Sequence, residues 1–229
     1  MGRQLIGVKQ RRGARFGSQV WGVGVVLLAV TTGCAAVHVA QRDDSRLASS
    51  AYLRGLMLER AADFSKALKV YKQALAHDPR SGAVHVRMGT VYVQLGQVEQ
   101  ARWAFERALT VVPNHPEALR WLARLHVSHG ELREAVHAYE QLVAVAPDDA
   151  ESWSALIDLY VLQGNLPAAI ERSRHLIRTH GGSNQLHFDL GVLYGRNNQF
   201  TEAIEELSRA FELASESLEV RLALGLTYE

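Results

Sequence analysis

A period of 34 residues runs through this chain from residue 48 onward and constrains its fold more than any other feature. Alanine recurs at this interval at Ala67, Ala101, Ala135, Ala169 and Ala203. Three other residue types keep the same spacing or multiples of it: Gly55, Gly89, Gly191 and Gly225; Tyr92, Tyr160, Tyr194 and Tyr228; Pro79, Pro113 and Pro147. A fixed period of this length indicates a stack of helical hairpins, each of which buries its apolar face only against its neighbours.

The period divides the chain into the blocks 48–81, 82–115, 116–149, 150–183 and 184–217 and a partial block, 218–229. The second block shows the pattern most clearly, with Met88-Gly89, Tyr92, Gly96, Ala101, Phe105, Ala108-Leu109 and Pro113. The fourth and first blocks repeat parts of it at Trp153, Leu156, Tyr160, Gly164 and Ala169 and at Tyr71, Ala74 and Pro79. This pattern resembles the tetratricopeptide repeat (TPR), a 34-residue helix-turn-helix unit. The resemblance covers residues 48–229 and implies an all-α superhelical solenoid of five full repeats and a partial sixth.

The repeated residues have physical roles in such a hairpin. Small residues on the first helix and alanines on the second allow a close helix–helix approach, near the short end of the usual 8–10 Å. Left-handed turn residues are expected at Gly96, Gly130, Gly164 and Asn198. Helix N-caps are expected at Ser81, Asp149, Ser183 and Ser217, and Pro116 suits a first helical turn.

Two parts of the repeat region depart from the pattern. In block four, Ile157 replaces the small residue, Ser173 the aromatic residue and Gly181 the proline, so we expect this junction to pack less regularly. The partial block 218–229 is apolar and lacks a second helix, whereas a terminal repeat needs a polar outer face. We therefore expect the natural protein to continue, or a partner to cover this end.

The N-terminus has the features of a secretory signal. Residues 1–33 carry five basic residues and no acidic one, and an apolar run, Val20–Val30, precedes Cys34, the only cysteine. The arrangement resembles a bacterial lipoprotein signal, which implies removal of residues 1–33 and lipidation of Cys34. Residues 34–47 would then form the lipidated N-terminus and a linker.

Two other interpretations of this segment stay open. Residues 20–40 contain no charged side chain across 21 residues, which is long enough for an uncleaved membrane anchor. Alternatively, Cys34 is only a small apolar residue of that helix. Both membrane interpretations place the repeats on the periplasmic side, because the basic flank stays in the cytoplasm. We expect a membrane-anchored envelope protein and favour the outer over the inner membrane.

Charge and motifs exclude several classes of function. Lys and Arg total 25, so without the five of residues 1–33 the chain has 20 basic and 24 acidic residues, a net charge of −4. A mildly acidic body argues against nucleic-acid binding. The chain has no nucleophile-elbow, zinc-protease or phosphate-loop motif, and we predict no enzymatic activity, cofactor or small-molecule substrate. His126, His129 and His137 are the candidate metal ligands, but no cysteine or suitably spaced carboxylate completes a site, and we predict no metal.

The family resemblance also implies where a partner binds, because the first helix of each repeat lines a concave groove. The groove positions that the resemblance assigns are Tyr52, Leu56, Val86, Thr90, Val93, Arg120, Arg124, Val127, Ser154, Asp158, Val161, Phe188, Val192 and Arg196. Arg120 and Arg124 share one helix face and are suited to receive a carboxylate. An apolar helix or extended segment with an acidic patch fits this set. The alternative is that Arg120 pairs with Glu117 on a solvated face. Trp103, on the second helix of its repeat, either folds over its neighbours or anchors a contact.

These observations predict a protein–protein interaction scaffold. We expect a periplasm-facing, membrane-anchored adaptor that binds a protein or peptide partner during assembly of an envelope complex. In architecture it resembles small repeat lipoproteins that act as pilotin-type assembly factors. Two alternatives stay open: a signal-anchored inner-membrane scaffold of an exopolysaccharide or secretion machine, and the repeat region of a longer enzyme that continues beyond Glu229.

Overall fold

The structure is a computed structural model that describes residues 43–228. The chain divides into two compact units, residues 1–47 and 48–229. Residues 43–60 are helical, and the helices that follow are α2 (Phe64–His77), α3 (Gly82–Gln94), α4 (Val98–Val111), α5 (Pro116–Ser128), α6 (Leu132–Val145), α7 (Ala150–Leu162), α8 (Leu166–His180), α9 (Asn184–Arg196), α10 (Phe200–Leu213) and α11 (Leu218–Tyr228). Cys34, the proposed signal and the apolar segment 20–40 lie outside the described residues.

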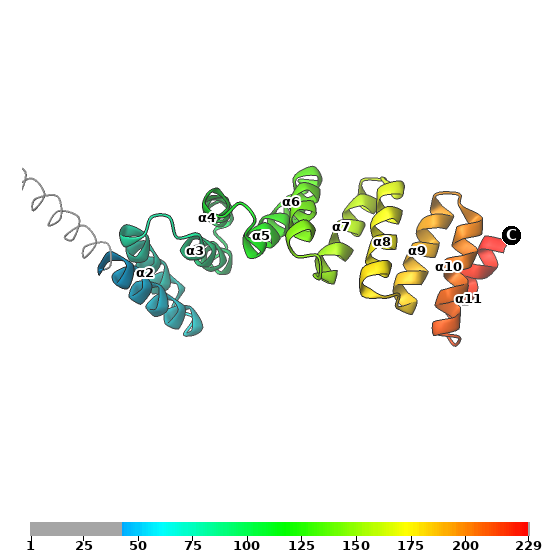
Figure 1. Cartoon of the computed structure of the whole chain (residues 1–229), viewed down its shortest axis with the longest axis horizontal. Coiled ribbons are helices and arrows are strands. Elements are labelled where there is room, and N and C mark those ends of the chain that lie inside the picture. The colour runs from blue at the N-terminus through cyan, green and yellow to red at the C-terminus, as the bar shows by residue number, and fades with distance from the viewer. Residues whose placement is uncertain (1–42, 229) are drawn as a thin grey trace, which may run out of the picture. The chain divides into compact units, whose positions relative to one another are not determined.

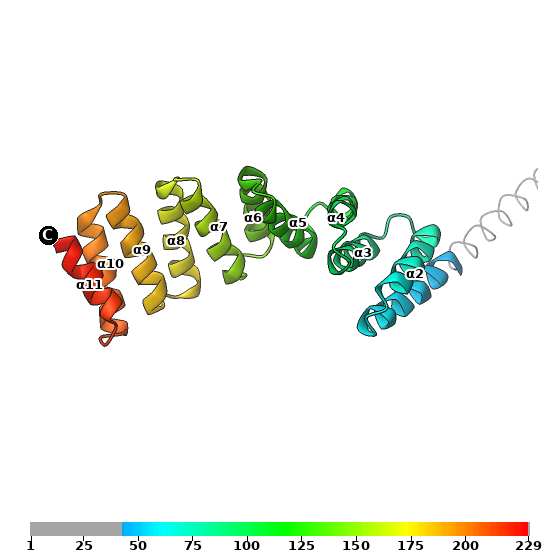
Figure 2. The same ribbon diagram turned by 180° about the vertical axis from the view of Figure 1, so that it is seen from behind.

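Within residues 48–228 the helices form hairpins that follow one another in chain order (Figures 1 and 2). We call the first helix of each hairpin the A helix and the second the B helix. The A helices are residues 43–60, α3, α5, α7, α9 and α11, and those from α3 onward begin 34 residues apart. Each helix packs mainly on the helices before and after it in the chain. The predicted all-α solenoid of helical hairpins is confirmed.

The turns within the hairpins use left-handed residues, as the sequence predicts. Gly96, Gly130 and Gly164 have φ angles of 68°, 74° and 73°, and Asn198 has a φ of 61°. In the first hairpin the equivalent turn residue is Ala62, which adopts a φ of 57°. Glycine and asparagine tolerate this conformation, whereas alanine is strained in it.

The A helices are capped largely as expected. Asp149 accepts a hydrogen bond from Ser152 N, and Ser183 accepts one from Leu186 N. Ser217 Oγ lies 3.4 Å from Val220 N at the start of α11. Ser81 is the N-cap residue of α3, as predicted, although its side chain makes no capping hydrogen bond.

The hairpins close through small residues on the A helices that face large residues on the B helices. A Cβ atom on Gly89 would lie 2.5 Å from Phe105 Cε1, and one on Gly55 would lie 2.3 Å from Tyr71 Cε1. A Cβ atom on Gly191 would likewise lie 2.7 Å from Leu207 Cγ. Glycine at these positions is therefore required by contact, because real Cβ atoms do not approach other atoms so closely.

Buried side chains along the hairpins form two core clusters. One cluster extends from Ala51 to Leu125 and the other from Leu119 to Ala203. The periodic alanines of the B helices are fully buried in these cores. At the end of the repeats, α11 buries Val220 but exposes Leu218, Leu222 and Leu226, in keeping with the apolar face expected there. Within the part of the chain described, none of the helices combines the length and hydropathy that crossing a membrane requires.

Repeat four exchanges the large and small partners of its hairpin. Ile157 on α7 occupies the position of Gly89, and Ser173 on α8 occupies the position of Phe105. The exchange leaves a hollow beside these two residues, and both line it. The irregular packing expected at this junction is therefore found.

Candidate partner-binding site

A hollow of about 260 Å³ opens between α7, α8 and α9. Helices α7 and α9 are consecutive A helices, and α8 is the B helix that joins them. The residues that line it are Ser154, Ile157, Asp158, Val161, Ser173, Leu186, Phe188, Asp189, Val192 and Leu193. The lining combines six apolar side chains with two aspartates and two serines.

Five of the fourteen predicted groove residues line this hollow. They are Ser154, Asp158, Val161, Phe188 and Val192, from two neighbouring A helices. Phe188 and Val161 are half-buried, and Val192 remains 36% exposed. The 34-residue period brings these side chains together because it places corresponding residues of α7 and α9 beside each other. That they bind a partner remains a prediction.

The two aspartates give the hollow a negative charge. Asp158 and Asp189 both line it, and its lining contains no lysine, arginine or histidine. Gln185 Nε2 donates a hydrogen bond of 2.9 Å to Asp189 Oδ1. Partial burial, and secondarily the charge of Asp189, raise the pKa of Asp158 above its usual value. Both aspartates nevertheless remain exposed, so the hollow presents its carboxylate charge to solvent.

The two predicted anion-binding arginines are already paired with acidic residues at the start of α7. Arg120 Nη2 lies 2.6 Å from Asp149 Oδ2, and Arg124 Nη2 lies 2.6 Å from Glu151 Oε1. The pair between Arg120 and Glu117, which was the alternative expectation, is not found. Glu117 instead lies 3.8 Å from Arg87 Nη1.

Asp149 both pairs with Arg120 and caps α7. Its Oδ2 accepts a 2.6 Å hydrogen bond from Ser152 Oγ, and its Oδ1 accepts one from Ser152 N. Partial burial alone would raise the pKa of Asp149, but the hydrogen bonds from Ser152 and Arg120 bring it below its usual value. Arg124 is more exposed, and its guanidinium lies 5.9 Å from the centre of the Trp121 ring.

The predicted groove residues of the first two repeats are less accessible than the sequence suggests. Val86 is 1% exposed and Thr90 8% exposed, and the Thr90 hydroxyl donates to the carbonyl oxygen of Arg87. Both side chains are buried in the packing of this part of the solenoid. The prediction that they line an open groove is therefore wrong. Tyr52, Leu56 and Val93 are half-buried, and the Tyr52 ring lies 6.1 Å from that of Tyr71. Val127 and Arg196 are exposed.

The fourteen predicted positions therefore do not form one continuous open strip. Burial removes Val86 and Thr90 from the surface, and ion pairs engage Arg120 and Arg124. The hollow of repeats four and five gathers five of the predicted groove positions around one largely apolar opening.

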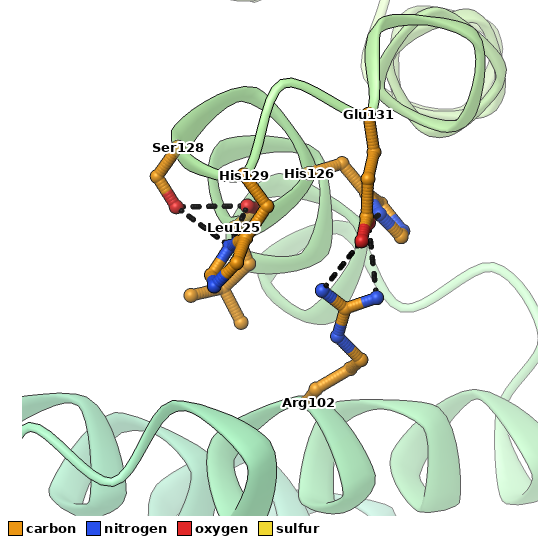
Figure 3. A network of polar contacts seen from close by, with 6 residues as sticks. All are labelled: Arg102, Leu125, His126, Ser128, His129 and Glu131. Atoms are coloured by element: carbon orange, nitrogen blue, oxygen red, sulfur yellow. Dashed lines mark hydrogen bonds and ion pairs between the residues drawn. The ribbon is translucent and has the colours of Figure 1, made fainter.

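A second polar cluster surrounds Glu131 in the turn between α5 and α6 (Figure 3). Arg102 on α4 donates to both carboxylate oxygens, at 2.9 and 3.1 Å, and His126 Nδ1 lies 2.5 Å from Oε2. The Arg102 and His126 hydrogen bonds lower the pKa of Glu131 to about 2. The arrangement joins consecutive repeats, and every member has a protein partner, so we assign it a structural role.

The three histidines considered as metal ligands make separate contacts. His126 bonds Glu131, His129 Nδ1 lies 2.8 Å from the carbonyl oxygen of Leu125, and His137 Nε2 lies 3.1 Å from Gln141 Nε2. Among residues 43–228, no group of three or more histidine, cysteine or acidic side chains is placed to hold a metal. His126 occupies the repeat position that holds Tyr92 and Tyr160, and it is half-buried with one hydrogen-bonded nitrogen.

Trp103 lies on α4, a B helix, and is 51% exposed. Its ring meets the buried His85 ring edge-on, with the ring centres 5.9 Å apart. The contact is edge-on and leaves about half of the residue exposed, so neither of the two expectations for Trp103 is settled.

Sequence comparison supports the repeat assignment over most of the described chain. Models of the tetratricopeptide repeat match residues 58–103, 82–125, 122–172 and 185–217. The chain belongs to the tetratricopeptide repeat family. No curated protein matches it.

Solved TPR structures have the same fold. A MamA protein is 20% identical with a TM-score of 0.61, over 74% of this chain and 93% of that one. YrrB, described as a TPR protein with an unusual peptide-binding site, is 20% identical with a TM-score of 0.60, over 76% and 89% of the two chains. MamA from Desulfovibrio magneticus RS-1 is 22% identical with a TM-score of 0.57, over 77% and 98%. At these identities the likeness establishes the fold alone.

Sequence reasoning missed several residues of the hollow. Ile157 and Ser173 were recognised as departures from the repeat, but not as the walls of an opening. Asp189, Leu186 and Leu193 were not assigned a role. The sequence did contain a signal for the hollow. In the other hairpins a small A-helix residue faces a large B-helix residue, whereas here Ile157 is the large residue and Ser173 the small one.

Proposed function

We propose that this TPR protein is a non-enzymatic adaptor that binds a segment of a partner protein in the hollow of repeats four and five. TPR solenoids typically act as protein-interaction scaffolds, because their stacked helices present extended surfaces. The binding surface would include the hollow and the neighbouring A-helix residues.

The size and lining of the hollow carry this proposal. Small-molecule pockets usually enclose about 300–1,000 Å³ and surround most of their ligand. A hollow of about 260 Å³ lies just below that range and is built from the surfaces of three helices. It is suited to one or two side chains of a longer chain that continues across the A helices. The peptide-binding site named for YrrB shows that a protein of this fold binds peptides, which supports a peptide partner here.

We further propose that the protein is anchored in the cell envelope, faces the periplasm and serves in assembly of an envelope complex. The support comes from the sequence, in which the basic stretch, the run Val20–Val30 and Cys34 have the order of a lipoprotein signal. Stable attachment needs more than one acyl chain, since a single chain binds a membrane only marginally.

Fractionation of cells that produce the full-length protein tests the anchor. We expect mature protein that lacks residues 1–33 and floats with outer membranes, and we expect Cys34→Ser to release or misprocess it. Retention of residues 1–33 on a membrane-bound protein, independent of Cys34, would instead establish the uncleaved inner-membrane anchor.

Site-specific photocrosslinking in intact cells tests the binding site. A photoreactive phenylalanine derivative that replaces Val192 would lie at the hollow. The same derivative in place of Trp103, on the B helix α4, is the matched control. We expect a defined crosslinked partner from position 192 that is lost when Val161→Trp fills the hollow. Equal crosslinking from both positions, insensitive to Val161→Trp, would refute this assignment.

A further inference from the structure

We infer that the hollow of repeats four and five selects a partner segment in which a lysine or arginine lies beside a bulky apolar residue. The inference rests on the proposed function and adds the chemistry of the partner. It also reverses the sequence-based expectation of a partner with an acidic patch.

The charge of the hollow favours a cation. Asp158 and Asp189 contribute two carboxylates, and no basic side chain lines the opening. Because Asp189 disfavours ionisation of Asp158, a bound ammonium or guanidinium group would relieve this repulsion. Complementary charge of this kind contributes to both partner choice and association rate.

The remaining lining favours an apolar group next to that cation. Phe188, Val161 and Val192 supply an aromatic and two branched surfaces, and Ile157 forms part of the wall. Lysine and arginine bury their aliphatic stems on such surfaces and keep the charged group at a polar edge. A neighbouring apolar side chain of the partner would occupy the rest of the volume.

Ser173 adds a polar group to the wall of the hollow. It is 4% exposed and lines the hollow. Its hydroxyl can donate a hydrogen bond to, or accept one from, a polar group of the bound segment.

An acidic partner is disfavoured by the charge of the hollow. Arg120 and Arg124 are the basic groups among the predicted groove positions of repeats one to three, and each already contacts a carboxylate at 2.6 Å. Arg196, in repeat five, is exposed. An acidic segment in the hollow would approach Asp158 and Asp189 with like charge, and this repulsion opposes its binding.

The test is a selection of random dodecapeptides displayed on phage, with the immobilised full-length protein in detergent as the bait. The variant Asp158→Asn/Asp189→Asn removes both carboxylates of the hollow without changing side-chain size. The control Asp148→Asn/Glu219→Gln removes two exposed carboxylates elsewhere. Selected peptides are then synthesised, and their Kd values are measured by fluorescence anisotropy at 50 and 300 mM NaCl.

We expect peptides enriched in lysine or arginine next to an aromatic or aliphatic residue. Their affinity should fall about tenfold or more in the hollow variant, stay within about twofold in the control, and weaken with salt. Enrichment of acidic or uncharged peptides, or equal binding by the hollow variant, would overturn the inference. If the selected peptides ignore the carboxylates but are lost with Val161→Trp, which fills the hollow, the inference fails while the proposed function stands. If no peptide is enriched at all, both fail.

Discussion

Arg120 Nη2 on α5 lies 2.6 Å from Asp149 Oδ2, the residue that caps α7. One contact therefore combines an ion pair between consecutive repeats with the start of the next A helix. In a solenoid, each repeat is stabilised largely by its interface with its neighbours. The arginine expected to bind a partner is thus part of the protein's own framework.

We predict that this pair contributes measurable coupling energy. In a double-mutant cycle of Arg120→Ala and Asp149→Asn, we expect a coupling of about 0.5–1.5 kcal/mol, because a partly buried, charged hydrogen bond is worth more than an exposed ion pair. Urea unfolding followed by circular dichroism gives the free energies of the four proteins.

Arg124→Ala with Glu151→Gln provides the matched control. This pair has the same 2.6 Å separation but is much more exposed, with 45% and 75% of the two side chains accessible. We expect its coupling to be near zero. Equal coupling in both cycles would contradict the role assigned to the Asp149 cap.

We predict a specific loss of stability in acid from Glu131. Its pKa is lowered to about 2 in the folded protein, below the ordinary value of 4.5, so the unfolded chain takes up the proton first as pH falls. The stabilisation is complete above about pH 5 and disappears as pH falls toward 2. The urea midpoints of the wild type and Glu131→Gln should therefore differ at pH 5–6 and converge toward pH 2. A constant difference across this range would show that Glu131 does not act through its charge.

We predict opposite effects for two glycine-to-alanine changes on A helices. Gly89→Ala places a methyl group 2.5 Å from Phe105 Cε1, and such overpacking costs about 1–3 kcal/mol. Gly195→Ala on α9 meets no atom within 4 Å, so the better helix propensity of alanine should leave stability unchanged or raise it by up to about 1 kcal/mol. Thermal unfolding compares the two. A tolerated Gly89→Ala would mean that the α3–α4 spacing adjusts.

The sequence predicted the parts of the fold that the 34-residue period determines. The turn glycines, the cap residues Asp149 and Ser183, and the close approach at Gly89 are local consequences of a repeated hairpin. The period also placed Phe188 and Val192 beside Val161, since equivalent positions of neighbouring repeats lie together.

What the period could not predict is how far each position is covered by side chains that do not repeat. Val86 and Arg120 are equivalent residues of repeats two and three, yet one is buried and the other bonds Asp149. The difference depends on the particular neighbours of each, which vary between repeats. Likewise, the ion pair of Arg87 with Glu117, 30 positions later, has no counterpart in the repeat pattern.

The hollow itself arises from an exchange that can be reversed. Ile157 and Ser173 stand where the other hairpins place a small residue on the A helix and a large one on the B helix. We predict that Ser173→Phe alone crowds Ile157 and costs about 1–3 kcal/mol, whereas Ile157→Ala/Ser173→Phe restores the usual order and recovers most of that loss. Thermal unfolding of the single and double variants measures this coupling.

The same double variant should lose its ligand while it remains folded. The phenyl ring at position 173 would enter the space that a partner side chain is proposed to use, so peptides selected on the wild type should bind at least about tenfold more weakly. Far-ultraviolet circular dichroism establishes that the helices persist, and Asp148→Asn/Glu219→Gln, which changes two exposed residues outside the hollow, is the control that should retain binding. If the stable double variant binds as tightly as the wild type, the hollow is a packing irregularity and the partner contacts another part of the A-helix surface.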